Sequence, residues 1–184
     1  MTALQTMVTR RVSAFDPVVL TTTKIRAGTA DNVIPESAYL LGTMRAMSEA
    51  SRRTAEEGIH RVAHGIGQAH GVEVEVEVHN GYPVTVNDAR MTGAARAIAN
   101  DLLGERAFIE LRSPVMGGED FSYILERWPG TMLFVGLRPR DVEDPDPVHS
   151  NRMQIDEDGM AVGVALHVAV AKRFLSSGGI EALD

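Results

Sequence analysis

Hydrophobic positions in the first half of the chain change between a helical and a strand-like period. Apolar residues three and four apart predict a helix over residues 2–14. Two strands are predicted at 18–28 and 38–47, followed by a helix that Ser48 caps and that runs to about residue 70. VEVEVEV at 72–78 alternates valine and glutamate, which predicts a strand with one buried face. This order predicts an antiparallel sheet with two helices on one face.

The second half has a different pattern, and the turn-rich stretch at 80–88 is the best candidate for a boundary. TMLFVGL at 131–137 is apolar nearly throughout, as is typical of a strand buried on both faces of a layered α/β sheet. FIELRS at 108–113 is the other predicted strand, and two strands do not form a stable sheet alone. The second half therefore resembles the edge of a larger domain. Helices are predicted at 88–103, just before Trp128 and at 156–175.

Composition and charge narrow the functional classes. The chain has 184 residues, of which 44% are hydrophobic and 23% charged, the balance of a folded globular protein. A formal net charge of −7 argues against a nucleic-acid partner, which requires clustered Lys and Arg. Without cysteine there is no disulfide and no thiolate metal site. No apolar run approaches the ~18 residues of a membrane span, and no targeting segment is evident. We therefore expect a cytoplasmic protein with no membrane partner.

His149 is the best candidate for a metal ligand on position alone. It lies in the acidic loop DPDPVHSN, between the predicted strand at 131–137 and the last helix. Ligand sites of α/β sheets lie at the carboxyl ends of strands. Asp144, Asp146 and Asp156 are near enough in sequence to orient its ring through hydrogen bonds. Because one imidazole cannot hold a catalytic ion, a ligand role depends on residues elsewhere.

Two other groups have both a functional and a structural interpretation. Asn32 and Arg45 flank one predicted strand, and together an amide and a guanidinium would suit a substrate carboxylate. Each alone is an ordinary turn or strand-end residue. Gly117 and Gly118, followed by Glu119, would let the backbone approach a substrate closely. The same three residues are more simply explained as a sharp entry into a helix.

Four stretches, taken in order, resemble the metal-dependent amidohydrolases that include hippurate hydrolase, N-acyl-amino-acid amidohydrolase and indoleacetyl-amino-acid hydrolase. They are GTADNVIPESAYLLGTMRA, HNGYPVTVND, SPVMGGEDFSYILERWPGTMLFVGL and VHSNRMQIDEDGMAVGVALHVAVA, and the resemblance runs along essentially the whole chain in the family's order and spacing. The resemblance implies an α/β protein whose residues 1–84 are a partial two-layer α+β lid and dimerisation domain lacking its first strand. Residues 85–184 would be the C-terminal part of a three-layer α/β/α, metallo-aminopeptidase-like catalytic domain.

The resemblance also implies roles for single residues. His149 matches the family's last metal ligand. Asn32 and Arg45 match lid positions that meet the carboxylate end of the substrate. A loop that borders the active site is matched by Gly117, Gly118 and Glu119. The family's Cys-Gly-His-Asp stretch, paired Glu-Glu and further His supply the other ligands and the general base, and these motifs are not in this sequence. Glu56-Glu57 lies in the lid helix and is not that pair.

These matches predict the C-terminal portion of an enzyme that hydrolyses the amide bond of N-acyl amino acids with a divalent metal, zinc or manganese. We expect this chain alone to contain no catalytic residue, to hold no metal stably and to be inactive. We also expect a homodimer through the lid and a small N-acyl amino acid as substrate of the full-length enzyme. The alternative is a non-catalytic dimerisation module derived from the lid.

Overall fold

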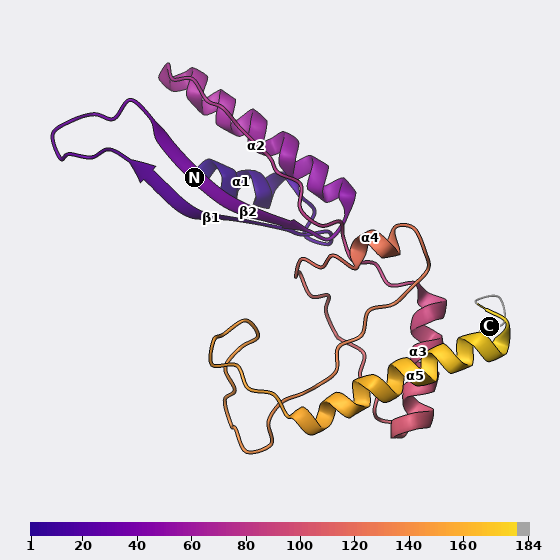
Figure 1. Ribbon diagram of the computed structural model, residues 1–184. Helices are drawn as coiled ribbons and strands as arrows, with labels where there is room; N and C mark the ends of the chain where they lie inside the picture. The colour runs from indigo at the N-terminus through magenta and orange to yellow at the C-terminus, as the bar shows by residue number, and fades with distance from the viewer. Residues whose placement is uncertain (180–184) are drawn as a thin grey trace. The chain divides into compact units, whose positions relative to one another are not determined.

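The computed structural model describes residues 1–179, which form two compact units (Figure 1). The first unit consists of Met1–Thr85 together with Pro114–Ser122. The second contains Val86–Ser113 and the described residues from Tyr123 onward. Each unit has its own helices and its own buried side chains.

A β-hairpin is the centre of the first unit. Strand β1 (Val18–Ala27) pairs antiparallel with β2 (Ala38–Ala46), from Val18 opposite Ala46 to Ala27 opposite Ala38. The register shifts between Thr22 and Lys24, and Gly28, at φ +72°, begins the connecting loop. Both strands confirm the predictions, and within residues 1–179 they form a two-stranded sheet.

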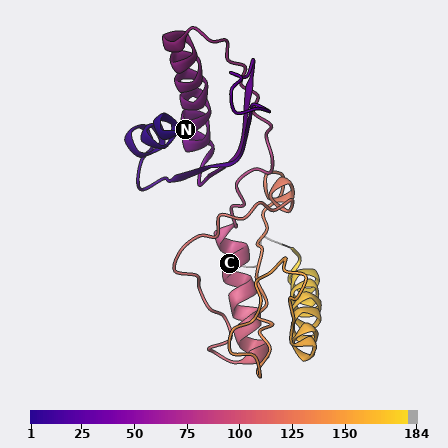
Figure 2. The ribbon, with the colours of Figure 1, turned by 90° about the vertical axis from the view of Figure 1, so that its left-hand side faces the viewer.

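Two helices cover the hairpin, and Figure 2 shows both on the same side of it. Helix α1 (Thr2–Arg11) packs against α2 (Glu49–His70), and both contact the strands. Met7 of α1 is 4% exposed, Val18 of β1 is 7% exposed and Ala55 of α2 is fully buried. These three side chains therefore form the apolar core between the helices and the hairpin, as the periodicity predicts.

Helix α2 begins and ends where its sequence predicts. The Ser48 hydroxyl accepts a hydrogen bond from the Ser51 N–H at 3.0 Å, and the Ser51 hydroxyl accepts one from the Ser48 N–H, which completes a capping box. Ser48 also donates to the Asp16 carboxylate at 2.5 Å. Gly71 ends the helix in the left-handed conformation, at φ 68°, which favours glycine.

The strand predicted at 72–78 is not formed. This segment is extended but has no ladder partner within residues 1–179. The alternation is nevertheless present, because Val74 and Val76 are half-buried while the glutamates are exposed. At Gly67 of α2, an added Cβ would lie 2.8 Å from the Val72 carbonyl oxygen and 2.5 Å from Val74 Cγ2. The segment therefore packs closely on α2, and the expected αββαβ order becomes αββα with an extended tail.

The second unit is built mainly from two helices that contact each other. Helix α3 (Ala89–Leu103) is capped by Asp88, whose carboxylate accepts hydrogen bonds from two first-turn N–H groups. A 3₁₀ turn, η1 (Glu157–Gly159), leads into α5 (Met160–Ser177). The short α4 (Ser122–Leu125) begins at the last residue of the first unit. All three predicted helices of the second half are present.

The strands predicted at 108–113 and 131–137 are not formed in the described structure. Both segments are extended, and neither belongs to a sheet within residues 1–179. Phe134 belongs to the segment expected to be a strand buried on both faces, yet its side chain is 66% exposed. Residues 131–137 are instead held at one end by Asn87, whose side chain forms two hydrogen bonds, of 3.1 and 2.9 Å, with the backbone of Met132. A strand requires a neighbour for its backbone groups, and an apolar sequence cannot supply one.

In the described part of the chain one helical segment, Glu157–Ser177, has the length and mean hydropathy, 1.3, of a membrane span, and the 18-residue apolar stretch within it is 0% buried. The core helix of a soluble protein passes the same test, so one such helix is weak evidence. The absence of a membrane partner stays a prediction.

Candidate functional site

The structure brings Arg45 together with the predicted glycine loop. We call Pro114–Ser122, which returns to the first unit, the strap. Arg45 lies near the end of β2, and its Nη1 donates a hydrogen bond to the Met116 carbonyl oxygen of the strap. Met116 directly precedes Gly117, so the guanidinium holds the start of the loop that contains Gly118 and Glu119. Sequence could not predict this contact, because Met116 takes part through its backbone.

Gly118 lies tightly against a neighbour, whereas Gly117 does not. A Cβ added at Gly118 would lie 3.1 Å from Cδ2 of the Tyr82 ring. At Gly117 the nearest atom would be Cγ1 of Val115 at 3.8 Å, an ordinary van der Waals distance. Neither glycine has a positive φ. The close approach at Gly118 is therefore to a side chain of the same unit.

Glu119 has a clear structural role in this loop. Its Oε1 accepts a hydrogen bond from the Phe121 N–H at 3.2 Å. Its carbonyl oxygen accepts two more from Ser122, one from the N–H at 3.3 Å and one from the hydroxyl at 2.5 Å. Ser122 is fully buried. Glu119 thus closes the turn into α4, which favours the structural interpretation, and its predicted role near a substrate stays untested.

Asn32 lies far from Arg45 along the hairpin. Asn32 is exposed in the loop beyond the last strand pair, Ala27 with Ala38, whereas Arg45 is opposite Val19 near the other end. Ala38 and Arg45 are separated by 45 − 38 = 7 residue steps. A strand rises 3.2–3.4 Å per residue, so the two positions are separated by about 23 Å. The expected convergence of the two side chains within one chain is not found.

His149 has an unusual backbone conformation. It is the single non-glycine residue with positive φ, at 74°, within residues 1–179. The left-handed region costs a residue with a Cβ about 1–2 kcal/mol, so the surrounding loop holds His149 against a local preference. The side chain is exposed, and within residues 1–179 its imidazole has no hydrogen bond or ion pair.

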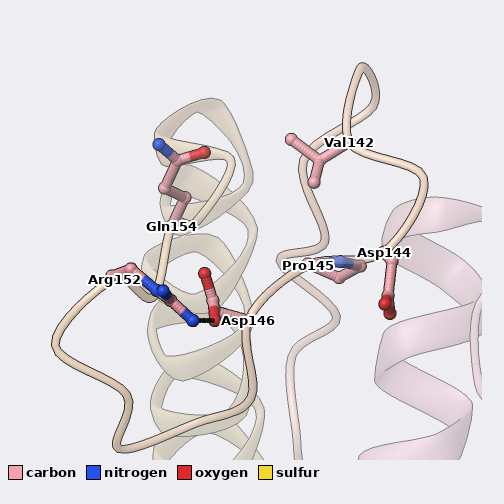
Figure 3. Close-up of a pocket in the computed structure, with 6 residues that line it drawn as sticks. All are labelled: Val142, Asp144, Pro145, Asp146, Arg152 and Gln154. Atoms are coloured by element: carbon pink, nitrogen blue, oxygen red, sulfur yellow. Dashed lines mark hydrogen bonds and ion pairs between the residues drawn. The ribbon is translucent and has the colours of Figure 1, made fainter.

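Of the three aspartates expected to orient His149, Asp146 and Asp156 pair with arginines, and none of the three bonds the imidazole in the described structure. Asp146 accepts a hydrogen bond from Arg152 Nη2 at 3.0 Å (Figure 3). Asp156 lies 3.6 Å from Arg140 Nε and caps η1 through the Asp158 N–H. A pocket of about 430 Å³ opens beside this loop, lined by Val142, Asp144, Pro145, Asp146, Arg152 and Gln154. Neither arginine partner is predicted from the sequence, although the opposite charges of Arg140 and Arg152 near these aspartates are a signal that could have found them.

The described residues do not form a metal centre. Within residues 1–179 no three His, Asp or Glu side chains lie together in a way that could hold an ion. A catalytic zinc site requires three protein ligands. His149 therefore offers one donor, and the described part of this chain does not by itself fit a resident metal ion.

Comparison with known proteins identifies relatives along nearly the whole chain. One is thermostable carboxypeptidase 1 of Saccharolobus solfataricus, which is 31% identical over 94% of this chain and 43% of its own length. Another is N-acetyldiaminopimelate deacetylase of Streptococcus pneumoniae, which is 36% identical over 89% of this chain and 42% of its own length. The chain thus spans about two fifths of the length of these relatives.

The fold is similar to a solved structure as well. A dinuclear metal-binding peptidase of the M20 family from Bacillus subtilis matches 92% of this chain and 44% of its own, with a TM-score of 0.73 and 27% identity. The model of peptidase family M20/M25/M40 matches residues 6–173. The resemblance to amidohydrolases is confirmed by these relatives. The chain belongs to peptidase family M20/M25/M40.

Proposed function

We propose that this chain is the C-terminal portion of a metal-dependent amidohydrolase that cleaves N-acyl amino acids. The observation that carries the proposal is the family match over residues 6–173, combined with relatives of which the chain spans about two fifths. In this proposal the first unit belongs to the lid, and the second to a three-layer catalytic domain. The strap, at 114–122, would then be a part of the catalytic half that returns to the lid.

The names of the relatives support the substrate class. A carboxypeptidase and an N-acetyldiaminopimelate deacetylase both hydrolyse an amide whose nitrogen belongs to an amino acid. Both substrates therefore carry a carboxylate near the scissile bond, and an arginine fork binds carboxylates well. Arg45 is the residue that we propose to meet this carboxylate. Asn32 would meet it as well only if another chain or another arrangement places the hairpin loop nearby.

The metal belongs, in this proposal, to the full-length enzyme. A dinuclear metal-binding peptidase among the structural relatives supports metal dependence of the family. In this chain His149 would be one ligand, and it lies on a strained backbone, as functional residues often do. Such ions polarise a carbonyl and activate water. No step of hydrolysis is assigned to residues of this chain.

Purified chain incubated with hippurate and either zinc or manganese tests the proposal. We expect no release of glycine above the buffer control, because one candidate ligand cannot form the metal centre. The whole enzyme encoded by a longer reading frame should release glycine, or the amino acid of another N-acyl substrate, in a metal-dependent way. Metal-dependent turnover by the 184-residue chain alone would contradict the proposed division of the site.

The alternative function, a non-catalytic dimerisation module, is favoured by one observation. The two-stranded sheet in the described residues leaves a β-strand edge on each side, and Ile25, Leu40 and Leu41 on its strands are 46–55% exposed. Such edges are templates for pairing with another chain. Sedimentation that finds a stable folded dimer, together with no hydrolysis by any longer form, would favour this alternative. A monomer would count against it.

A further inference from the structure

The strap leaves the second unit at Pro114 and returns to it after Ser122, yet it lies in the first unit. Something in the first unit must therefore hold it. Arg45 makes the side-chain hydrogen bond to its backbone, through Nη1 and the Met116 carbonyl oxygen. We propose that Arg45 is a positioning residue that fixes the strap, and with it the loop at Gly117–Glu119, against the end of β2.

The contact between Arg45 and Met116 lies directly before the loop at Gly117–Glu119 and can therefore limit its movement. Met116 is the residue just before Gly117, and Ser122, the last residue of the strap, is fully buried. Glu119 and Ser122 are joined by two hydrogen bonds, so the second half of the strap is held by its own turn and by burial. Gly117 and Gly118 lie between these two fixed points. Without Arg45 the start of the strap loses its hydrogen bond to β2, and the two glycines, of which Gly118 also lies against Tyr82, permit motion of the backbone there.

An arginine suits this role because the bond is charge-assisted and directional. A hydrogen bond with an ionised donor contributes more to stability than a hydrogen bond between two neutral groups. Within residues 1–179 the bond to Met116 uses one of the five N–H donors of Arg45. The other donors remain available for a substrate carboxylate. This last step rests on the proposed function, whereas the positioning of the strap does not.

Limited proteolysis, with the fragments identified by mass spectrometry, tests the positioning role directly on this chain. Arg45→Ala should raise the rate of cleavage within 114–122 about tenfold, because loss of one charge-assisted hydrogen bond makes opening of this segment more frequent. Arg45→Lys should restore most of the protection, because an ammonium on a flexible stem can still donate to one carbonyl. Arg26→Ala is the matched control, since Arg26 is an exposed arginine of the same hairpin without a polar side-chain contact in residues 1–179.

Three results would overturn the inference. Unchanged cleavage of the strap in Arg45→Ala would show that Arg45 does not hold it. A rise of similar size in β1, β2 and α2 would show general destabilisation instead of positioning. Failure of Arg45→Lys to restore protection would show that the hydrogen bond to Met116 is not what protects the strap. Because no substrate is present, failure of the proposed hydrolysis would leave these readouts unchanged, and the two proposals can fail separately.

Discussion

Helices α2 and α5 are similar in length but differ in what covers them. Helix α2 buries four residues, among them Ala55 and Gly67, against α1, the hairpin and the extended tail. Helix α5 is more apolar on average, yet it contains no buried residue, and Val164, Val168 and Leu175 are 52–79% exposed. A helix that is apolar on several sides is normally buried. Helix α2 therefore has packing partners in its own unit, whereas α5 lacks many of its own among the described residues.

The largest expected effect comes from deleting an apolar side chain in each unit. Met7→Ala should lower the free energy of unfolding by about 2–5 kcal/mol, because Met7 is buried between the helices and the hairpin. Phe134→Ala should change it by less than about 0.5 kcal/mol, since Phe134 is exposed. Urea unfolding followed by circular dichroism measures both. Equal losses would contradict the difference between the units.

A pair of glycines on α2 tests how tightly the tail at 72–78 is packed. Gly67→Ala should destabilise the chain by about 1–3 kcal/mol, because its Cβ would overlap the Val72 carbonyl oxygen and Val74. Gly65→Ala, with nothing within 4 Å of its Cβ, should stabilise by about 0.5–1 kcal/mol through helix propensity. Thermal unfolding of the two variants gives the comparison. Stabilisation by both would mean that the tail does not pack on α2.

Removal of a helix cap should destabilise a helix of either unit by a similar amount, because a cap contacts only the first turn of its own helix. Ser48→Ala removes the cap of α2, and Asp88→Ala removes the cap of α3. Each substitution should lower the free energy of unfolding by about 1 kcal/mol. Exchange of the first-turn amides, measured by NMR, reports each helix separately. A cost confined to α2 would show that α3 is already frayed and would sharpen the difference between the units.

The smallest expected effect concerns the backbone of His149. His149→Gly should raise stability by about 0.5–1 kcal/mol, since relief of the left-handed strain exceeds the added freedom of glycine in the unfolded chain. His149→Val should lower it, because a β-branched residue tolerates positive φ least. Melting temperatures of both variants provide the measurement. Loss of stability in His149→Gly would exclude strain at this position.

Sequence predicted the elements whose partners lie nearby in the chain. Ser48 and Gly71 gave the bounds of α2, and the two strands around Gly28 pair as a hairpin. The three remaining predicted strands failed for one reason. Their patterns of apolar residues are those of strands, but pattern does not provide the neighbouring backbone that a ladder requires. The exposed Phe134 shows the consequence most directly.

The candidate site was predictable in composition but not in arrangement. Arg45 and the loop at Gly117–Glu119 were selected separately, and the bond between Arg45 and the Met116 carbonyl joins them. The acceptor of that bond is a backbone carbonyl oxygen, which every residue has, so the identity of Met116 does not predict the contact. Asn32 and Arg45 are close in sequence but lie toward opposite ends of a hairpin, which follows once the register is known. The arginine partners of Asp146 and Asp156 likewise depend on the folded loop.

The central claim is that His149 is one ligand of a metal centre whose other ligands lie outside this chain. Isothermal titration of zinc into the purified chain and into His149→Ala tests it most directly. We expect weak binding that is nearly the same in both proteins, because the described residues contain no second and third ligand beside His149. Tight one-to-one binding by the chain that His149→Ala abolishes would contradict it.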